Sequence, residues 1–304
     1  FDAIENTDAI VGIDIAKNVH WAGIILPNGK EIKKPFSFNN NKIGFKSLVE
    51  TVKNVLTMLN FKKAIIGMEP TGHYWKSCAR YLKKIDWIKV VTVNPYHVKN
   101  SKEFDDNCQT KNDKKDCMTI ARLIKDARFF EPYLPEGIWA ELRNLSNTRA
   151  ELVGKQNAVK NRLIATMDEY FPEYTKVFKK ILSRTSEEIL KECPFPEDIK
   201  SKGKEELLKH IKKTVKRGYS KKQVETIYEL ANESIGTTEG TEGAKFQLNM
   251  YIEEAKLLEK QIKMTEQELE RQLKETGFYE SLTSIQGIGI VSAATFVGEV
   301  GDIN

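Results

Sequence analysis

Short apolar segments rich in β-branched residues open the chain. They occupy residues 9–16, 19–26 and 31–38, and their composition is typical of β-strands. The second and third segments are joined by residues 27–30 (Pro-Asn-Gly-Lys), and the Asn-Gly pair favours a hairpin turn. Because consecutive strands with short connections are usually neighbours, we expect three antiparallel strands here.

Beyond residue 40, segments of helical periodicity alternate with short apolar segments. Such alternation predicts parallel strands joined by helical crossovers. Three meandering strands followed by two crossovers predict an α/β fold of the ribonuclease-H-like type, which we place at residues 1–130. The expected elements are a helix at 41–59, a strand at 63–69, a helix at 74–84, a strand at 89–93 and a helix at 111–128.

The second half is predicted to be mainly helical. After a linker with two prolines, one long helical pattern begins near Trp139 and ends before Pro172, and another runs over residues 245–274. In the later pattern, apolar residues alternate steps of three and four, as in a coiled-coil seam. The two helices could pack antiparallel on each other or against a second protomer. The seam is Leu248, Tyr251, Ala255, Leu258, Ile262, Thr265 and Leu269.

Between these helices lies a basic stretch that predicts two short helices joined at residues 218–220. The functional interpretation is a phosphate-contacting surface, and the alternative is a solvated helical hairpin. We expect residues 236–243 to be a flexible connector. The candidate contact residues are Lys212, Lys213, Lys216 and Arg217.

The glycine-rich segment 282–294 is similar to a helix-hairpin-helix. Gly287 and Gly289 would let the backbone approach a DNA phosphate, and the alternative is a turn between two packed helices. We therefore expect a helical coiled-coil domain with a basic insertion at 131–275 and the beginning of a further, incomplete domain at 276–304.

Composition narrows the class of protein further. Of 304 residues, 40% are hydrophobic, enough for a sizeable core, and the net charge of +5 permits nucleic-acid binding without arguing for it. The four cysteines form no Cys-x-x-Cys pair, so we expect reduced thiols. No apolar run reaches the roughly 18 residues that span a bilayer, and no signal peptide is visible, so we expect a cytoplasmic protein without a membrane partner.

Four carboxylates occupy positions where this fold could bring them together. Asp14 interrupts the first apolar strand, Glu69 ends the fourth strand, and Asp113 and Asp116 share one face at the start of the last helix. Two such charges about 4 Å apart repel by roughly 4 kcal/mol at an effective dielectric near 20. Mg²⁺ or Mn²⁺ removes this repulsion, and we expect two ions, as in phosphoryl transfer.

Each acid also has an ordinary interpretation. Glu69 could be a strand-end acid, and Asp113 and Asp116 could favour the helix dipole. Only the joint placement supports a catalytic site. Nearby lysines are candidates for phosphate contact or for solubility alone, namely Lys17, Lys111, Lys114 and Lys115.

Residues 11–17 (Val-Gly-Ile-Asp-Ile-Ala-Lys), 67–74 and 111–117 resemble the three acidic motifs of the DEDD transposases of the insertion sequence 110 family. The N-terminal domain of that family is similar to the Holliday-junction resolvase RuvC. The resemblance implies a metal-binding catalytic tetrad of Asp14, Glu69, Asp113 and Asp116. It also implies a prokaryotic, nucleoid-associated homodimer or homotetramer that acts on DNA with a structured non-coding RNA of the mobile element.

The resemblance also has a departure. The family has a catalytic serine downstream of a glycine-rich hairpin, in a region that we expect this chain not to reach. Ser281, Ser284 and Ser292 precede or lie within the hairpin and are not assigned this role.

Other classes of protein remain to be weighed against a transposase. A sugar-kinase or actin-like ATPase needs a small-residue phosphate loop after the first acid, which residues 15–18 lack. A RuvC-like structure-specific endonuclease or a DNA invertase would account for the tetrad. A non-catalytic coiled-coil scaffold would not need all four acids.

Overall fold

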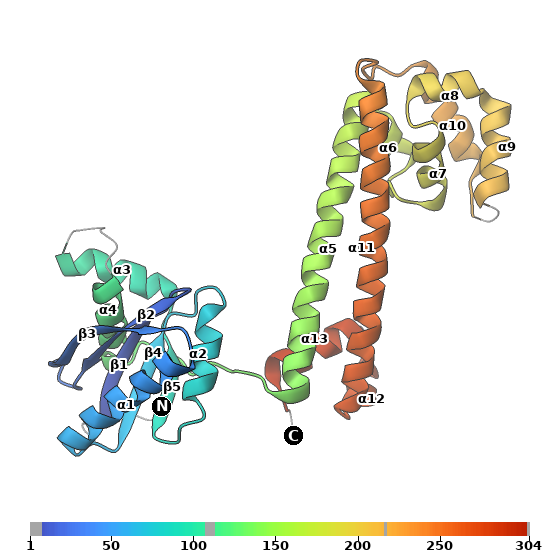
Figure 1. The fold of residues 1–304 in the computed structure, drawn as a ribbon. Coiled ribbons are helices and arrows are strands. Elements are labelled where there is room, and N and C mark those ends of the chain that lie inside the picture. The colour runs from blue at the N-terminus through green and yellow to red at the C-terminus, as the bar shows by residue number, and fades with distance from the viewer. Residues whose placement is uncertain (1–7, 107–112, 216–217, 303–304) are drawn as a thin grey trace. The chain divides into compact units, whose positions relative to one another are not determined.

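The computed structural model describes residues 8–106, 113–215 and 218–302, and the chain divides into two compact units, Phe1–Leu134 and Pro135–Asn304 (Figure 1). Each unit has its own hydrophobic core. Of the predicted site residues, Lys111, Lys216 and Arg217 lie outside the described residues.

The first unit contains a mixed five-stranded sheet with the strand order β3-β2-β1-β4-β5. The first three strands pair antiparallel, and β4 and β5 extend the sheet parallel to β1. This order confirms the predicted mixed sheet with flanking helices and is consistent with a ribonuclease-H-like fold. The elements are β1 (Asp8–Asp14), β2 (Val19–Ile25), β3 (Glu31–Asn39), α1 (Lys42–Leu59), β4 (Lys63–Met68), α2 (Tyr74–Leu82), β5 (Ile88–Thr92), α3 (Pro95–Asp106) and α4 (Asp113–Lys125).

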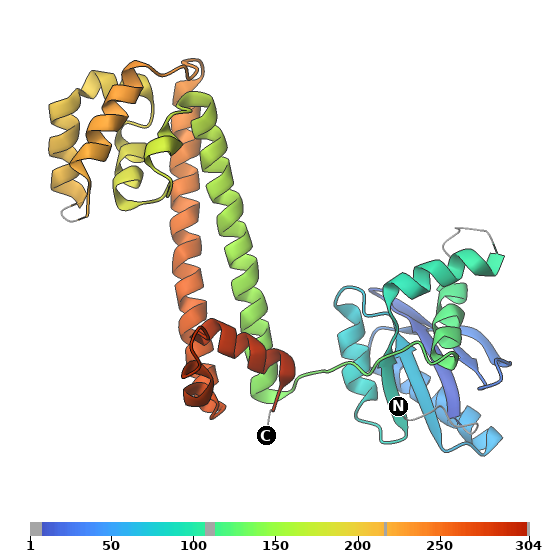
Figure 2. The ribbon, with the colours of Figure 1, turned by 180° about the vertical axis from the view of Figure 1, so that it is seen from behind.

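Strand alternation divides the core of this unit into two layers. Val11 and Ile13 of β1 face the layer built with α1 and α2, whereas Ile10 faces the layer built with α4. Because side chains alternate along a strand, Gly12 and Asp14 also belong to the α4 face. Figures 1 and 2 show α4 on the opposite side of the sheet from α1.

Helix α3 was not predicted from the sequence. It begins at Pro95, and the side chain of Asn94 accepts a hydrogen bond from the Tyr96 amide at 2.9 Å. Asn before Pro is a helix start as well as a turn signal. Only a weak apolar pattern follows, with Val98 in the core, so the helical period was not visible.

A row of three glycines lets α4 lie directly on the sheet. Gly12 is paired with Gly23 on one neighbouring strand and with Gly67 on the other. A Cβ at Gly12 would come within 2.1 Å of the Cys117 carbonyl oxygen and 2.4 Å of the Ala121 nitrogen. At the two flanking glycines it would meet side chains of α4, each at 2.4 Å. The helix therefore packs closer to the sheet than any larger residue would allow.

We predict that Gly12→Ala destabilises the first unit by about 3 kcal/mol or more, because the added methyl group meets helix backbone that cannot move aside cheaply. Urea unfolding followed by tryptophan fluorescence measures this, since three of the four tryptophans lie in this unit.

The control for this prediction is Gly154→Ala in helix α5 of the second unit, where an added Cβ meets nothing within 4 Å. That change should stabilise its helix by up to about 1 kcal/mol. A Gly12→Ala protein within about 0.5 kcal/mol of wild type would contradict the close packing of α4.

The second unit is helical among its described residues. Its two longest helices, α5 and α11, pack antiparallel along each other within one chain (Figures 1 and 2), the first of the two arrangements expected from the sequence. The buried seam of α11 contains Ile252, whereas the predicted Tyr251 and Thr265 are only half-buried. The elements are α5 (Gly137–Tyr170), α6 (Tyr174–Val177), α7 (Arg184–Glu192), α8 (Pro196–Lys202), α9 (Lys204–Val215), α10 (Lys221–Asn232), α11 (Thr241–Glu275), α12 (Tyr279–Thr283) and α13 (Ile290–Val300).

The helices α6 to α10 form a cluster with a core shared with one end of the helix pair. The predicted flexible connector at 236–243 is wrong. A Cβ on Gly236 would lie 2.0 Å from the Tyr170 carbonyl oxygen, and the Thr237 amide donates to Glu169 at 3.1 Å. The connector is thus held against the end of α5, and α11 already begins at Thr241. Contacts distant in sequence could not be seen in the glycine content alone.

Helix α13 packs against the other end of the helix pair. A Cβ on Gly298 would lie 2.8 Å from the Arg143 nitrogen, and Arg143 Nε donates to Glu299 at 3.0 Å. The hydroxyl of Thr295 lies 3.2 Å from that of Ser146. A close backbone approach and polar contacts on both sides of it orient this helix.

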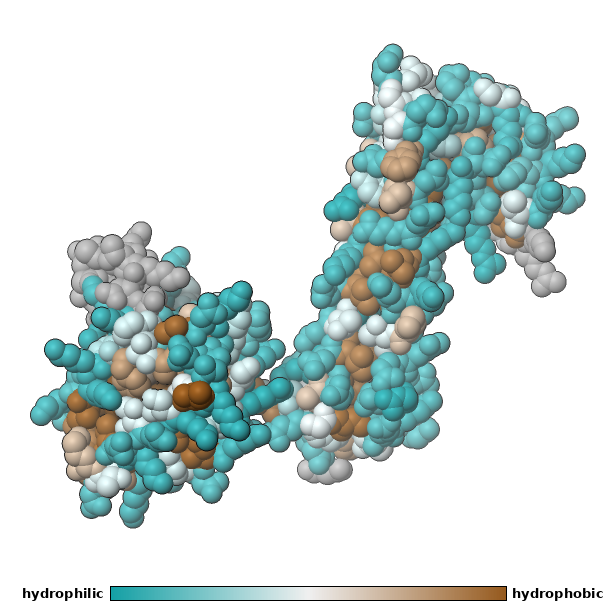
Figure 3. All heavy atoms as spheres, viewed as in Figure 1, coloured by the Kyte–Doolittle hydropathy of each residue, from teal (hydrophilic) through white to brown (hydrophobic). Residues whose placement is uncertain are grey.

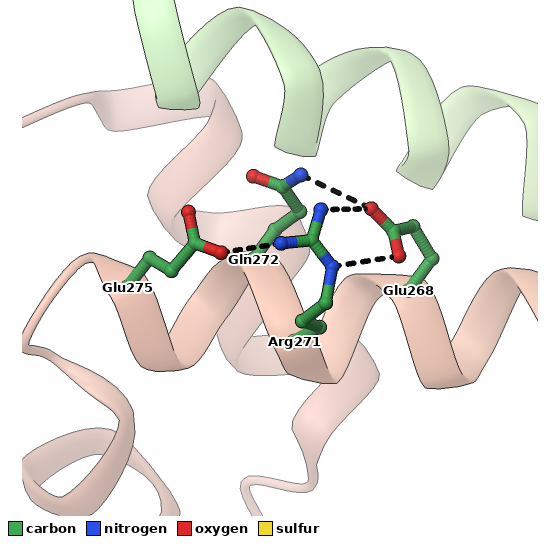
Figure 4. A network of polar contacts seen from close by, with 4 residues as sticks. All are labelled: Glu268, Arg271, Gln272 and Glu275. Carbon is green, nitrogen blue, oxygen red and sulfur yellow. Dashed lines mark hydrogen bonds and ion pairs between the residues drawn. The ribbon is translucent and has the colours of Figure 1, made fainter.

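Charged pairs gather on the last turns of α11. Figure 4 shows Arg271 between Glu268 and Glu275, with Nε donating to Glu268 at 2.9 Å. These hydrogen bonds, with one from Gln272, lower the pKa of Glu268 to about 2.

Figure 3 shows apolar side chains reaching the surface along the helix pair. No helix among the described residues combines the length and the apolar content needed to cross a membrane.

Candidate active site

Two of the four predicted acids lie side by side at one edge of the sheet. Asp14 ends β1, and Glu69 directly follows β4. Ile13 and Met68 are partners in the parallel pairing, so the next residue of each strand lies at the same level. Asp14 and Glu69 are both half-buried. The parallel register of two neighbouring strands therefore brings them together.

Helix α4 adds a third acid. Asp116 is 5% exposed, and it precedes Cys117, whose carbonyl lies over Gly12 of β1. Burial, together with the charges of Asp14 and Asp116, raises the pKa of the Cys117 thiol to about 12. Both carboxylates therefore lie close to this thiol, since Coulomb interactions weaken with distance. Asp113 is the first residue of α4, and its side chain lies outside the described positions.

The donor chemistry of these residues fits a hard divalent cation. Among the side chains that the structure describes, no three His, Cys, Asp or Glu residues are close enough to form a ready-made metal cage. The Glu69 carboxylate instead accepts a hydrogen bond from the Thr71 hydroxyl. Mg²⁺ needs no such cage, because it is usually held by one or two carboxylates together with water and substrate phosphate. Asp14 and Asp116 would supply two such carboxylates.

Predicted phosphate-contacting lysines surround these acids. Lys17 is exposed in the turn after β1, and its carbonyl accepts a hydrogen bond from Asn40 at 3.0 Å. Lys114 and Lys115 are exposed in the first turn of α4, with Lys114 Nζ 5.1 Å from the centre of the Trp21 ring. Trp21 is the β2 partner of Asp14. Positive side chains thus lie on both chain segments that carry the buried acids.

His20 is a site residue that the sequence analysis missed. It is fully buried between Phe38 and Phe45, and its Nδ1 accepts a hydrogen bond from the Ala16 amide at 3.1 Å. This bond holds the turn that follows Asp14. Burial lowers the pKa of His20, so the ring is neutral with its proton on Nε2. A histidine at an inward position of an apolar strand was the available signal.

We predict that acid destabilises the first unit through His20. Above the ordinary histidine pKa of about 6.5, the imidazole is neutral in both states and contributes no pH dependence. Below it, the unfolded chain takes up a proton that the folded protein resists, so stability falls as pH falls. Thermal unfolding followed by tryptophan fluorescence from pH 8 to 5 measures this fall. His20→Gln should flatten it, and an unchanged acid slope in that variant would disprove the assignment.

The other predicted contact residues lie in the second unit. Lys212 and Lys213 are exposed in the last turn of α9. Gly287 has a φ of +90°, which only glycine adopts easily, and Gly289 directly precedes α13. Both glycines are exposed, with nothing within 4 Å of an added Cβ. All four residues belong to the second unit, whereas the carboxylates belong to the first.

The mixed sheet, with two acids at adjoining strand ends and a third on the helix that covers them, is consistent with the ribonuclease-H-like class of nucleic-acid enzymes. A family model of the DEDD transposases of the insertion sequence 110 group, described as a transposase, matches residues 11–172. This match covers more than half of the chain, so the protein belongs to this family. Membership supports a DNA transposase function. A comparison with curated proteins found no match.

Proposed function

We propose that this protein cleaves and exchanges DNA strands of an insertion sequence, using divalent cations held by Asp14, Glu69, Asp113 and Asp116. The observation that carries the proposal is the packing of α4 on the glycine row. That packing sets buried Asp116 and strand-end Asp14 around one thiol, whose pKa both carboxylates raise. Carboxylates gathered at one partly buried place are costly to keep charged, and a bound divalent cation offsets that cost.

Each residue would have a role that follows from the element on which it lies. Asp14 and Glu69 come from the rigid sheet and would hold one side of the metal site. Asp116 and Asp113 would hold the other side from α4. Bound Mg²⁺ or Mn²⁺, which we propose as two ions, would supply charge stabilisation at the reacting phosphate. Lys17, Lys114 and Lys115 would bind the neighbouring phosphates and orient the strand.

Two further features of the proposal concern partners. The motif resemblance supports guidance by a structured RNA of the element. A homodimer or homotetramer is supported by four side chains of α11 that are each more than half exposed, at spacings of four, seven and seven. Such a heptad-like apolar stripe is unfavourable in water and suits a coiled-coil contact with a second copy. The exposed residues are Phe246, Met250, Leu257 and Met264.

The hairpin between α12 and α13 is proposed as a third nucleic-acid contact. Exposed Gly287 and Gly289 leave room for a phosphate at the start of α13, as in a helix-hairpin-helix. The domain division that goes with this proposal is a catalytic domain at 1–130, a coiled-coil domain at 131–275 and a further domain from 276.

We predict that Asp14→Asn and Asp116→Asn each reduce Mg²⁺- or Mn²⁺-dependent DNA cleavage by at least about 100-fold, since loss of outer-shell partners alone costs 10- to 100-fold. Both replacements keep size and shape but remove the charge that binds the cation. The substrates are branched DNA, linear duplex DNA and DNA–RNA assemblies. Asp126→Asn is the matched control, because Asp126 is exposed on the same unit and pairs with Lys125 at 3.2 Å.

Calorimetric titration with Mn²⁺ on the same samples separates metal binding from catalysis. Wild-type binding that is lost in both site variants and kept in the control supports the carboxylate site. Cleavage confined to branched DNA would favour the structure-specific endonuclease over the transposase mechanism. Neither cleavage nor carboxylate-dependent metal binding in the wild type would reject the mechanism and favour a scaffold.

A further inference from the structure

A cavity of about 550 Å³ lies in the helical cluster of the second unit, outside the residues that the family model matches. It is lined by residues of the segment that leads into α7 and of the turn before α10. Its lining contains Lys179, Lys180 and Arg184 and no carboxylate. All three cationic side chains are exposed. The cavity wall is therefore positively charged on one side.

These three cations have no ion-pair partner among the described residues. A second cavity in the same cluster differs in how its lysines are paired. That cavity holds about 120 Å³ and also contains two lysines, Lys200 and Lys245, but each is bound to a carboxylate of its own lining. The lysines of the smaller cavity are thus neutralised by carboxylates of its own lining. The positive charge of the larger cavity has no such counter-charge and can attract an external anion.

A hydroxyl of a largely buried residue in the same cavity also makes no hydrogen bond within the described residues. Thr185 is 5% exposed and lines the cavity, and its hydroxyl makes no hydrogen bond within the described part of the chain. The Thr185 hydroxyl is not among the buried unsatisfied atoms of the described residues, so it is accessible from the cavity and can bind a ligand oxygen there.

The start of α7 contributes further donors. Ser183 precedes the nine-residue helix without capping it through its side chain, so the first amides of α7 also lack a side-chain acceptor. A helix start favours negative charge. Hydroxyl, amides and three cations together match the oxygen atoms and charge of a phosphate group.

We propose that this cavity binds phosphate groups of a nucleic-acid backbone. Cationic side chains, hydroxyls and helix-start amides are the groups that proteins use for backbone contacts, and none of them reads a base sequence. The cavity would anchor the substrate nucleic acid or its guide independently of the carboxylate site. The inference rests on the proposed action on nucleic acids, and it concerns binding rather than cleavage.

The test measures binding in EDTA, so that no metal-dependent cleavage takes place. The probes are labelled single-stranded DNA and RNA of about 16 nucleotides and the same sequence as a DNA duplex. Fluorescence anisotropy gives the Kd of the full chain over a series of salt concentrations. The variant is Lys179→Ala/Lys180→Ala/Arg184→Ala. The control is Lys155→Ala/Lys200→Ala/Lys263→Ala, which removes the same net charge from lysines already paired with Glu151, Glu197 and Glu259.

The cavity variant should bind the preferred probe at least about tenfold more weakly, with uniform loss across sequences. Its slope of log affinity against log salt should decrease by about 2 for a single strand, since each phosphate contact contributes about 0.7. The control slope should change by less than about 1. Comparison of the three probes identifies whether RNA, single-stranded DNA or duplex DNA occupies the site.

Thr185→Val gives an independent reading, because it keeps the volume and removes only the hydroxyl. It should weaken binding a few-fold with an unchanged melting temperature. Equal affinity and equal salt slope in the cavity and control variants would overturn the cavity proposal while leaving the carboxylate mechanism intact. A wild-type protein that binds none of the probes would also overturn the cavity proposal, whereas the carboxylate mechanism is decided by the cleavage and metal-binding measurements.

Discussion

The contact on which the catalytic unit depends is the direct packing of helix α4 on the glycine row of the sheet. At Gly12 only a hydrogen atom separates strand from helix, and any side chain would meet backbone atoms. This distance decides where the first turns of α4 lie, and so where Asp116 lies relative to Asp14. Well-packed interiors do not deform continuously, so a helix displaced from the row would carry its carboxylate away from the strand ends.

The same packing explains why this unit can keep acids at its edge. Asp116 is held almost completely out of water, a position that is unfavourable for a carboxylate without compensation. The neighbouring Cys117 responds with a raised thiol pKa, so it remains protonated and does not add a third negative charge. His20 holds the turn after Asp14 from the other layer of the core. Two layers of side chains therefore support one edge of one sheet.

The second unit is stabilised by the packing of long helices. Long helices are stable only when an apolar stripe is buried, and α5 and α11 bury theirs against each other along the chain's own hairpin. The cluster of α6 to α10 caps one end of the pair, and α13 closes the other through Gly298 and the Arg143–Glu299 contact. The unpaired cations Lys179, Lys180 and Arg184 remain outside these packing contacts. Their charge is therefore available for a partner rather than used for stability.

Local sequence determined the strand and helix order of the first unit except for α3, and both long helices, because alternation and helical spacing depend on residues a few positions apart. It also placed Asp14, Glu69 and Asp116 at element ends, and parallel strands bring such ends to one edge. Gly12, Gly23 and Gly67 could have been noticed as glycines inside strands, a sign of close backbone approach. Their alignment across three strands, however, follows only from the register. Only the tertiary structure decided that α5 pairs with α11, that Gly236 is packed against the end of α5, and that residues 177–185 share a cavity with Gly218 and Gln223. Contacts between segments far apart in the chain depend on packing, which no local pattern encodes.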